Sequence, residues 1–331
     1  MKKHLWAMIY AFILTAFTLY SVLDTFVITR VYTPEVTLTA VSEGGKTEAE
    51  PDETEKSGQT AASTAPVTGP ETEPATTEQS ESTHSAEPAV GENYYSDENI
   101  TITITEYDYL GTAVYVADVT LSSAEYLKTA LARSSYGRNV TEKTSVIASR
   151  AGAILAINGD YYGAQERGFV IRNGVIYRKT AKSNAEALVI YEDGSFEIVN
   201  ETETSAEKLL AAGAYNVFTF GPGLLSDGEI CVSLNSEIGR AMSSNPRTAI
   251  GIVDDLHYLF VVSDGRTNAS EGLSLYELAG FMKELGAVCA YNLDGGGSST
   301  MYFNGKVINN PTTNGKNITE RSVSDIVYIG Y

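Results

Sequence analysis

The stretch that decides the fold is residues 256–302, LHYLFVVSDGRTNASEGLSLYELAGFMKELGAVCAYNLDGGGSSTMY. Its first apolar run, Leu256–Ser263, is typical of a buried strand, and Ala287–Leu293 is a second such run. Between the two runs, Ser274 and Glu277 have the spacing of a capping box, and the apolar residues that follow repeat at helical spacing. This order predicts a β-α-β crossover, which favours parallel strands in one sheet with a right-handed connection.

Two polar loops follow the two strands of this unit. Asp264 and Arg266 come directly after the first strand, and Asp294 ends the second. Asp294 opens a run of small residues, namely Gly295, Gly296, Gly297, Ser298 and Ser299. Because the carboxyl ends of parallel strands lie at one edge of a sheet, where open sheets bind ligands, we expect the two loops to meet there. Glycines let a backbone approach a ligand, and N–H and hydroxyl groups suit an anion, but a solvated turn has the same pattern.

The rest of the domain surrounds this unit. Residues 100–331 keep the alternating apolar pattern of strands and are enough for one globular domain. We expect strands at Ile100–Thr105 and Ala113–Leu121, and helices near Ala124–Ala132 and Glu142–Ala151. Together with the crossover, these elements predict an α+β fold with mixed, α/β-like sheets in a single globular domain.

A second strand end carries polar side chains. The short apolar run Ala153–Ile157 predicts a buried strand that leads directly into Asn158 and Asp160. Because loops at strand ends hold side chains on a rigid scaffold, both residues are candidates for the site. An ordinary Asn-Gly turn is the alternative. A clear hairpin follows around Asn173-Gly174.

The N-terminal third of the chain has a different composition. Leu5–Leu23 contains no charge and is long enough to span a bilayer, and no good cleavage site follows it. We therefore expect residues 1–32 to form an uncleaved signal anchor with a cytoplasmic N-terminus, so that residues 100–331 lie outside the cell. Residues 33–99 are rich in Ser, Thr, Pro and Glu, with 14 acidic and 2 basic residues between positions 42 and 98, and predict a disordered linker. This acidity argues against nucleic acid as a partner.

The reactive side chains of the domain exclude several classes of catalytic site. Only His257 of the three histidines lies in the domain, and no nucleophile elbow, zinc-ligand spacing or phosphate-binding P-loop is present. Carboxylate pairs catalyse reactions at acetal centres, and arginines bind phosphate oxygens in pairs. The candidate catalytic carboxylates are Asp160, Asp264, Asp294 and Glu320, and Asp294 and Asp160 are the leading candidates among them. The candidate substrate-binding residues are Asn158, Arg247, Arg266, Asn292, Gly295, Gly296, Gly297, Ser298, Ser299 and Arg321.

Two alternatives stay open from the residues alone. Oxygen ligands suit a hard cation, so a calcium site at Asn158, Asp160 and Asp294 is an alternative to catalysis or an addition to it, although nothing in the sequence requires a cofactor. The cysteines, Cys231 and Cys289, are either joined in a disulfide or buried as free thiols.

Several motifs occur in an order that resembles the phosphodiester glycosidase family. They are LAINGDYY (155–162), PRTAIG (246–251), SDGR (263–266), LSLYELA (273–279), NLDGGGSSTM (292–301) and ER (320–321). Each motif is unspecific alone, but the ordered set is specific and covers roughly residues 145–331. The resemblance implies hydrolysis of a sugar-1-phosphodiester outside the cytoplasm by an α/β domain with mixed sheets. The anchor and the acidic linker favour a bacterial, membrane-bound member of the family.

The sequence therefore predicts a membrane-anchored extracellular hydrolase. Its substrate is expected to be a sugar-phosphate glycopolymer or a small glycosyl phosphodiester, cleaved at the glycosidic bond. The alternative is a cell-surface polysaccharide-binding or exopolysaccharide-assembly protein that keeps the fold without turnover.

Overall fold

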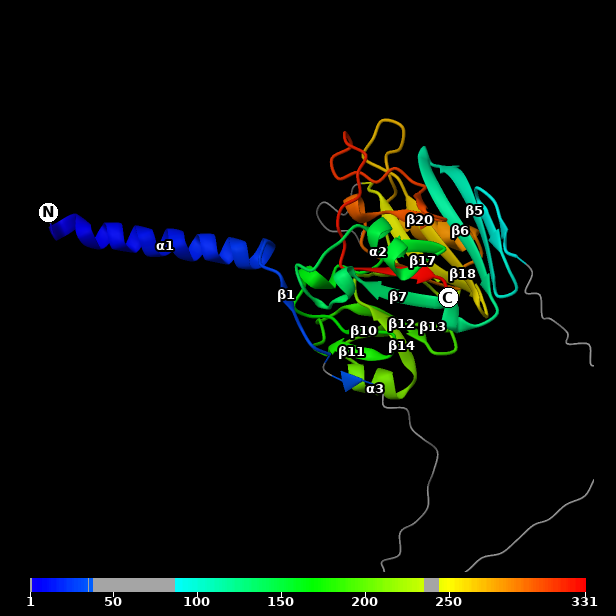
Figure 1. The fold of residues 1–331 in the computed structure, drawn as a ribbon, viewed down its shortest axis with the longest axis horizontal. Coiled ribbons are helices and arrows are strands. Elements are labelled where there is room, and N and C mark those ends of the chain that lie inside the picture. Colours follow the sequence, from blue (N-terminus) through cyan, green and yellow to red (C-terminus); the bar gives the residue numbers. More distant parts are fainter. Residues whose placement is uncertain (1, 35, 38–86, 235–243) are drawn as a thin grey trace, which may run out of the picture. The chain divides into compact units, whose positions relative to one another are not determined.

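The structure is a computed structural model that describes residues 2–34, 36–37, 87–234 and 244–331. Most of the predicted linker lies outside these residues. The described part contains an N-terminal helix and one globular domain built from several sheets with helices packed on them (Figure 1). The α+β class expected from the sequence is confirmed. The helices are α1 (Lys2–Phe26), α2 (Thr144–Ala151), α3 (Ala206–Ala211) and α4 (Leu275–Glu284).

The largest sheet has nine strands in the order β16-β15-β19-β17-β18-β6-β5-β4-β3. In that order the bounds are Glu229–Ile230, Gly223–Ser226, Cys289–Asn292, Arg247–Asp254, His257–Ser263, Thr112–Leu121, Ile100–Tyr109, Tyr94–Ser96 and Ala89–Val90. A five-stranded sheet has the order β21-β20-β9-β22-β7. Its strands are Lys306–Val307, Met301–Phe303, Leu155–Asn158, Asp325–Ile329 and Leu127–Leu131.

Two further sheets complete the domain. A six-stranded sheet has the order β13-β12-β14-β10-β11-β2, with bounds Phe196–Asn200, Glu186–Tyr191, Ala214–Phe218, Val170–Arg172, Val175–Arg178 and Val36–Thr37. A small sheet pairs β1 (Arg30–Val31) with β8 (Gly137–Arg138). Figure 1 shows β10, β11, β12, β13 and β14 grouped near α3.

The main core lies between the nine-stranded and five-stranded sheets. It joins residues such as Ile250, Phe260 and Tyr291 of the larger sheet to Ile157 and Val327 of the smaller one. The other face of the nine-stranded sheet is covered by α4, while α2 and α3 cover the five-stranded and six-stranded sheets. Each helix thus buries its apolar side against one sheet, and the polar strand ends stay at the edges of the layers.

The β-α-β crossover has the predicted direction but not the predicted neighbours. The strands β18 and β19 point the same way because each pairs antiparallel with β17, which lies between them. All strand pairs among the described residues are antiparallel, so the expectation of parallel neighbours in mixed sheets is wrong. The physical reason is that β17 pairs with β18 through a short turn and fills the place beside it. The carboxyl ends of β18 and β19 nevertheless lie at one edge, as the sequence analysis required.

Two predictions from local sequence patterns are confirmed. Ser274 and Glu277 form the predicted capping box at the start of α4. The hairpin β10–β11 turns at Asn173 and Gly174, both with positive φ. The predicted helix near Ala124–Ala132 is wrong: Ala124–Tyr126 forms one 3-10 turn capped by Ser123. The residues after that turn form β7, because they pair with the last strand, β22.

The N-terminal segment after α1 joins the domain. The strand β1 pairs with β8, and β2 pairs with β11, before the acidic segment begins. The chain is again in the domain at β3 and β4, which pair with each other and with β5. Strands thus occupy residues 36–37, 89–90 and 94–96, which lie within the range predicted to be linker. The backbone groups of these short segments find partners on existing sheet edges, which composition alone does not reveal.

Candidate functional site

The site is built where β19 and β9 end beside each other. The Asp294 N–H donates to the Gly159 carbonyl at 3.1 Å, and the Asn158 amide Nδ2 donates to the Asp294 carbonyl at 2.5 Å. The loop that carries Asp294 is thereby fixed to the loop that carries Asp160. Two motifs separated by more than a hundred residues therefore form one wall.

Asn158 holds the two large sheets together at this point. Its Oδ1 accepts hydrogen bonds from Thr248 Oγ1 at 2.8 Å and from the Thr300 N–H at 3.1 Å. Since Nδ2 is bonded to Asp294, both ends of this fully buried side chain are used within the protein. Asn158 therefore orients the site, and the substrate-binding role expected from the sequence has no support in these contacts.

Asp294 is a buried carboxyl beside a half-exposed arginine. Asp294 is 6% exposed, whereas the Arg321 side chain is 41% exposed. Arg321 Nη2 lies 3.2 Å from Asp294 Oδ2 and donates to Ser298 Oγ at 2.6 Å. Burial raises the pKa of Asp294, although Arg321 and Ser298 act in the opposite direction. A raised pKa in a site rich in charged groups is a feature of general acids.

Asp160 is the second buried carboxyl, with 1% exposure. Its Oδ2 accepts from the Thr219 N–H at 2.9 Å, and its Oδ1 accepts from the Tyr161 N–H at 2.6 Å. The Asp294 N–H donates to the carbonyl of Gly159, the residue before Asp160, and the charge of Asp160 adds to the raised pKa of Asp294. The structure thus brings together the two carboxylates that the sequence analysis put first.

Two residues of the site were missed from sequence. Arg172 Nε donates to Asp325 Oδ2 at 2.7 Å, and Arg172 Nη2 lies 3.7 Å from Asp160 Oδ2. The Asp160 N–H donates to Asp325 Oδ1 at 2.8 Å. Arg172 and Asp325 are fully or almost fully buried, and a charged residue in a strand that is otherwise apolar was the available signal.

The pKa values of this buried cluster shift in the same direction for different reasons. Burial raises the pKa of Asp325 to about 6, although Arg172 opposes the shift. Burial lowers the pKa of Arg172, but Asp325 and Asp160 outweigh it, so that its pKa is raised overall. The single cation faces two carboxylates, whereas each carboxylate faces one cation and another carboxylate. The cluster therefore favours the charged form of Arg172, whereas it disfavours the charged form of Asp325.

The glycine loop packs closely against other protein groups. A Cβ on Gly295 would lie 2.9 Å from the Pro246 carbonyl oxygen, one on Gly296 would lie 2.9 Å from Arg266 Nη2, and one on Gly297 would lie 2.2 Å from Thr313 Oγ1. The N–H groups of Gly296, Ser298 and Ser299 donate to backbone carbonyls. The glycines therefore allow other protein groups to pack closely against the loop. The loop does not present the row of free N–H groups that is expected of an anion nest.

The cations of the site gather around this loop instead. Arg266 Nε and Nη2 donate to Asn245 Oδ1 at 3.2 and 3.0 Å, and Nη1 donates to the Thr313 carbonyl at 2.8 Å. These partners are neutral, so they hold the guanidinium without cancelling its charge. Burial, and then the charge of Arg321, lower the pKa of Arg266. Two arginines close enough to repel each other indicate a place for an anion.

Arg247 lies on the inner side of the same loop. Its Nε donates to the Leu273 carbonyl at 2.8 Å, and its Cδ is 3.9 Å from a Cβ built on Gly295. Arg247 is mostly buried at the start of β17, whereas Arg266 is exposed. The structure therefore brings the three predicted arginines to one loop, with Arg266 and Arg321 facing solvent.

Several buried polar atoms near the loop have no hydrogen-bond partner within the described part of the chain. They are Asn292 Oδ1, Ser299 Oγ and Thr300 Oγ1. Buried polar groups in native proteins are nearly always satisfied, so these atoms require water or a ligand. Their position beside Asp294 adds acceptors and hydroxyls to the site. Asn292 Nδ2 is already used, since it donates to the Gly221 carbonyl at 2.8 Å.

The other two predicted carboxylates serve as acceptors within the protein. Asp264 accepts from the Asn310 N–H at 2.9 Å and from Asn309 Nδ2 at 3.1 Å. Glu320 accepts from the Ser145 N–H at 2.9 Å and from Ser145 Oγ at 2.6 Å, at the start of α2. Asp264 thus fixes the loop after β21, and Glu320 fixes the residue before Arg321 to a helix. Both carboxylates thus have hydrogen-bond partners within the protein, as Asp160 does.

The family model of the phosphodiester glycosidases matches residues 151–330. The chain belongs to the phosphodiester glycosidase family. The matched region contains Asp160, Asp294, the three arginines and the glycine loop, which are the parts that form the site. It begins after β7 and α2, so the N-terminal strands of the nine-stranded sheet lie outside it.

Relatives cover different parts of this phosphodiester glycosidase chain. The SPbeta prophage-derived uncharacterized protein YomE of Bacillus subtilis is 29% identical over 241 residues, which are 67% of this chain and 37% of YomE. The mouse N-acetylglucosamine-1-phosphodiester alpha-N-acetylglucosaminidase is 39% identical over 66 residues, 20% of this chain and 13% of that enzyme. This chain thus spans well under half the length of these relatives.

Solved structures show the same fold. The catalytic domain of the zebrafish N-acetylglucosamine-1-phosphodiester alpha-N-acetylglucosaminidase aligns with a TM-score of 0.56 and 21% identity, over 70% of this chain and 83% of that domain. A hypothetical protein from Synechocystis aligns with a TM-score of 0.55 and 17% identity, over 70% and 62%. These similarities concern the fold, and the chemistry of the site depends on the contacts described above.

The three residues of the calcium alternative have partners within the protein. Within the described ranges, no group of three or more His, Cys, Asp or Glu side chains could hold a metal ion. Of the three residues proposed from sequence, Asn158 Oδ1 already accepts two hydrogen bonds, Asp160 is bonded to N–H groups, and Asp294 faces Arg321. A guanidinium beside the carboxylate opposes a second cation at the same oxygens. Cys231 and Cys289 are free thiols.

Proposed function

We propose that this domain hydrolyses the glycosidic bond of a sugar-1-phosphodiester. The observation that carries the proposal is the pair of guanidinium groups, Arg266 and Arg321, next to the buried carboxyl of Asp294. The arginines suit a phosphate because each presents several N–H donors to its oxygens. Family membership supports the same reaction class.

The proposed reaction uses the two buried carboxyl groups. Asp294, whose pKa is raised, donates a proton to the oxygen that joins the sugar to phosphorus. Asp160, the second carboxylate, accepts a proton from the water that attacks the anomeric carbon. The bond from the anomeric carbon to oxygen breaks, and the hydroxyl of water takes its place. The products are a free sugar and a phosphomonoester, which Arg266 and Arg321 release.

The cellular setting is part of the same proposal. The helix segment Trp6–Thr25 is long and apolar enough to cross a membrane, and none of it is buried against the domain. We propose that it is an uncleaved anchor, and the lysines before it, Lys2 and Lys3, favour a cytoplasmic N-terminus with the domain on the extracellular side. The substrate would then be a sugar-phosphate glycopolymer of the cell surface, or a small glycosyl phosphodiester that reaches it.

The test is turnover by the full chain in detergent. The substrate is N-acetylglucosamine 1-(methyl phosphate), and the released sugar is measured. Asp294→Asn should reduce kcat at least a thousandfold while the melting temperature changes little, because the amide cannot donate a proton to the leaving oxygen. The matched control, Asp255→Asn, changes an exposed turn and should keep full activity. Full activity in Asp294→Asn refutes the assignment, and binding without sugar release by the wild type supports the non-catalytic alternative.

A further inference from the structure

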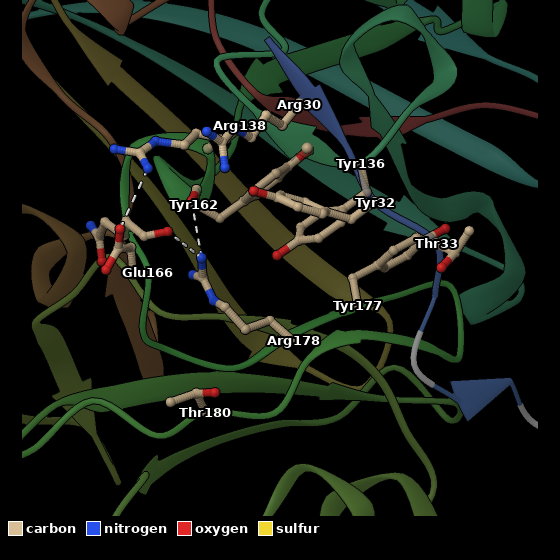
Figure 2. Close-up of a pocket in the computed structure, with 13 residues that line it drawn as sticks. Arg30, Tyr32, Thr33, Tyr136, Arg138, Tyr162, Glu166, Tyr177, Arg178 and Thr180 are labelled. Carbon is tan, nitrogen blue, oxygen red and sulfur yellow. Dashed lines mark hydrogen bonds and ion pairs between the residues drawn. The ribbon is translucent and has the colours of Figure 1, made fainter. Parts of the chain in front are cut away.

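A cavity lies where the segment after α1 meets the domain. It has a volume of about 510 Å³, within the range of small-ligand sites. One side comes from Arg30, Tyr32 and Thr33 of the N-terminal segment, and the other comes from the β8 region, the loop after β9 and the strand β11. Figure 2 shows the tyrosine rings of this cavity gathered together, with the arginine side chains and Glu166 beside them.

The cavity has an aromatic wall with two accessible rings. Tyr136 stacks on Tyr162 at a centroid distance of 5.1 Å and packs against Tyr177 at 5.0 Å, and Tyr32 lies 6.0 Å from Tyr136. Tyr136 and Tyr162 are buried and form the base, while Tyr32 is 46% exposed and Tyr177 is half-buried. Rigid aromatic faces of this kind give a sugar ring a large contact area at a low cost in conformational entropy.

Arginines make the same cavity suitable for an anionic group. Arg138 lies 3.5 Å from Glu166 and 3.8 Å from Asp24, so its charge is shared between two carboxylates, and Arg30 pairs with Asp24. Arg178 is 8% exposed and donates through Nε and Nη1 to backbone carbonyls, but its Nη2 has no partner in the part of the chain that is described. The residues that line the cavity thus include three arginines and a single carboxylate, Glu166.

Gly137 in β8 allows the N-terminal segment to approach closely. A Cβ at Gly137 would lie 1.9 Å from the Arg30 carbonyl oxygen, so glycine is needed there for β1 to pair with β8. The Tyr32 N–H donates to the Tyr136 carbonyl at 2.9 Å. These contacts make Tyr32 part of the cavity wall and not an incidental neighbour.

One loop connects this cavity to the candidate site. Residues 158–163 run from Asn158 and Asp160, which belong to the site, to Tyr162 and Gly163, which line the cavity. Arg172 also lies at both places, because its guanidinium is 3.7 Å from Asp160 and 5.7 Å from the Tyr162 ring. The same loop therefore supplies residues to both the site and the cavity wall.

We propose that this cavity is a second glycan subsite, which binds a saccharide unit carrying a phosphate or carboxylate group. Its sugar ring packs on Tyr32 and Tyr177, and Arg138 binds the anionic group. This inference rests on the proposed function only in taking the substrate to be a glycopolymer with sugar-phosphate units. Binding at the cavity itself does not require catalysis.

The test is calorimetric titration of the full chain in detergent with N-acetylglucosamine 1-phosphate. Wild type should show two binding steps. Tyr177→Ala and Arg138→Gln should each weaken one step at least tenfold, while Arg266→Gln weakens the other. Tyr177→Phe should restore binding because it keeps the ring, and Tyr276→Ala, an exposed tyrosine on α4, is the matched control. Circular dichroism verifies that each variant is folded.

The outcomes separate this inference from the proposed function. A single step that only Arg266→Gln abolishes overturns the second subsite. Glycerol 1-phosphate carries the phosphate without a ring, and equal affinity for it at the cavity overturns the glycan assignment in favour of a simple phosphate or lipid-headgroup site. Tyr177→Ala should turn over N-acetylglucosamine 1-(methyl phosphate) at the wild-type rate. A wild type that binds at the cavity but releases no sugar leaves the subsite intact and refutes only the proposed hydrolysis.

Discussion

Gly296→Ala isolates the contribution of the arginine beside the glycine loop. Gly296 has φ of +64°, and a Cβ there would lie 2.9 Å from Arg266 Nη2. The left-handed backbone costs a side chain about 1–2 kcal/mol. Relief of the contact moves the guanidinium away from the phosphate position by a few tenths of an ångström or more. Loss of a charge-assisted hydrogen bond to phosphate costs about 1.5–3 kcal/mol, which is about a tenfold to hundredfold rise in KM.

Gly152→Ala is the matched control for the backbone effect. Gly152 has φ of +67° at the end of α2, and a Cβ there would meet nothing within 4 Å. Both variants should lose about 2–8 °C of melting temperature, since the strain is similar in a domain of this size. Only Gly296→Ala should raise KM for N-acetylglucosamine 1-(methyl phosphate). Equal KM values in the two folded variants would refute the phosphate-binding role of Arg266.

Two further predictions concern the groups that support the site. Asp325→Asn removes a carboxyl whose pKa is raised from 3.8 to about 6. The contribution of this carboxyl to the stability of the fold is therefore present below pH 3.8 and is lost as the pH rises through about 6. The free energy of unfolding of wild type minus that of the variant should therefore fall by about 3 kcal/mol between pH 4 and pH 8 in urea titrations, and a rise would contradict the assigned pKa direction. For Asn158→Leu, three hydrogen bonds between the sheets are lost and Thr248 Oγ1 and the Thr300 N–H are left unpaired. The cost should be roughly 4 kcal/mol, measured as a fall of about 8 °C or more in melting temperature, and an unchanged value would show that Asn158 does not join the sheets.

Part of the site was predictable because its signals are local. The capping box at Ser274 and Glu277 depends on residues three apart, and it forms α4 as expected. Strand direction then follows from one helix between two strands, which places Asp264 and Asp294 at the same edge. The fixed order of polar residues after apolar strands was therefore enough to select Asp160 and Asp294 as the leading carboxylates.

The roles of individual residues were less predictable, because they depend on partners distant in sequence. Asp264 and Glu320 were further candidates for catalysis, and the structure shows that each carboxylate accepts hydrogen bonds from loop or helix groups. Arg172 read as one residue of a hairpin, and its role follows only from the approach of Asp325 and Asp160. No spacing rule reports such a contact, since it is set by the packing of separate sheets.

The sequence by itself determined the apolar helix, the α4 crossover, the Asn-Gly hairpin and the loop that carries Asp294, because each depends on residues near one another in the chain. Only the tertiary structure decided that β17 lies between β18 and β19, and that residues after Tyr126 form a strand and not a helix. The tertiary structure also decided that the arginines gather at the glycine loop. The physical reason is that hydrogen bonds between distant strands and the burial of charges outweigh the small free-energy differences of local propensity.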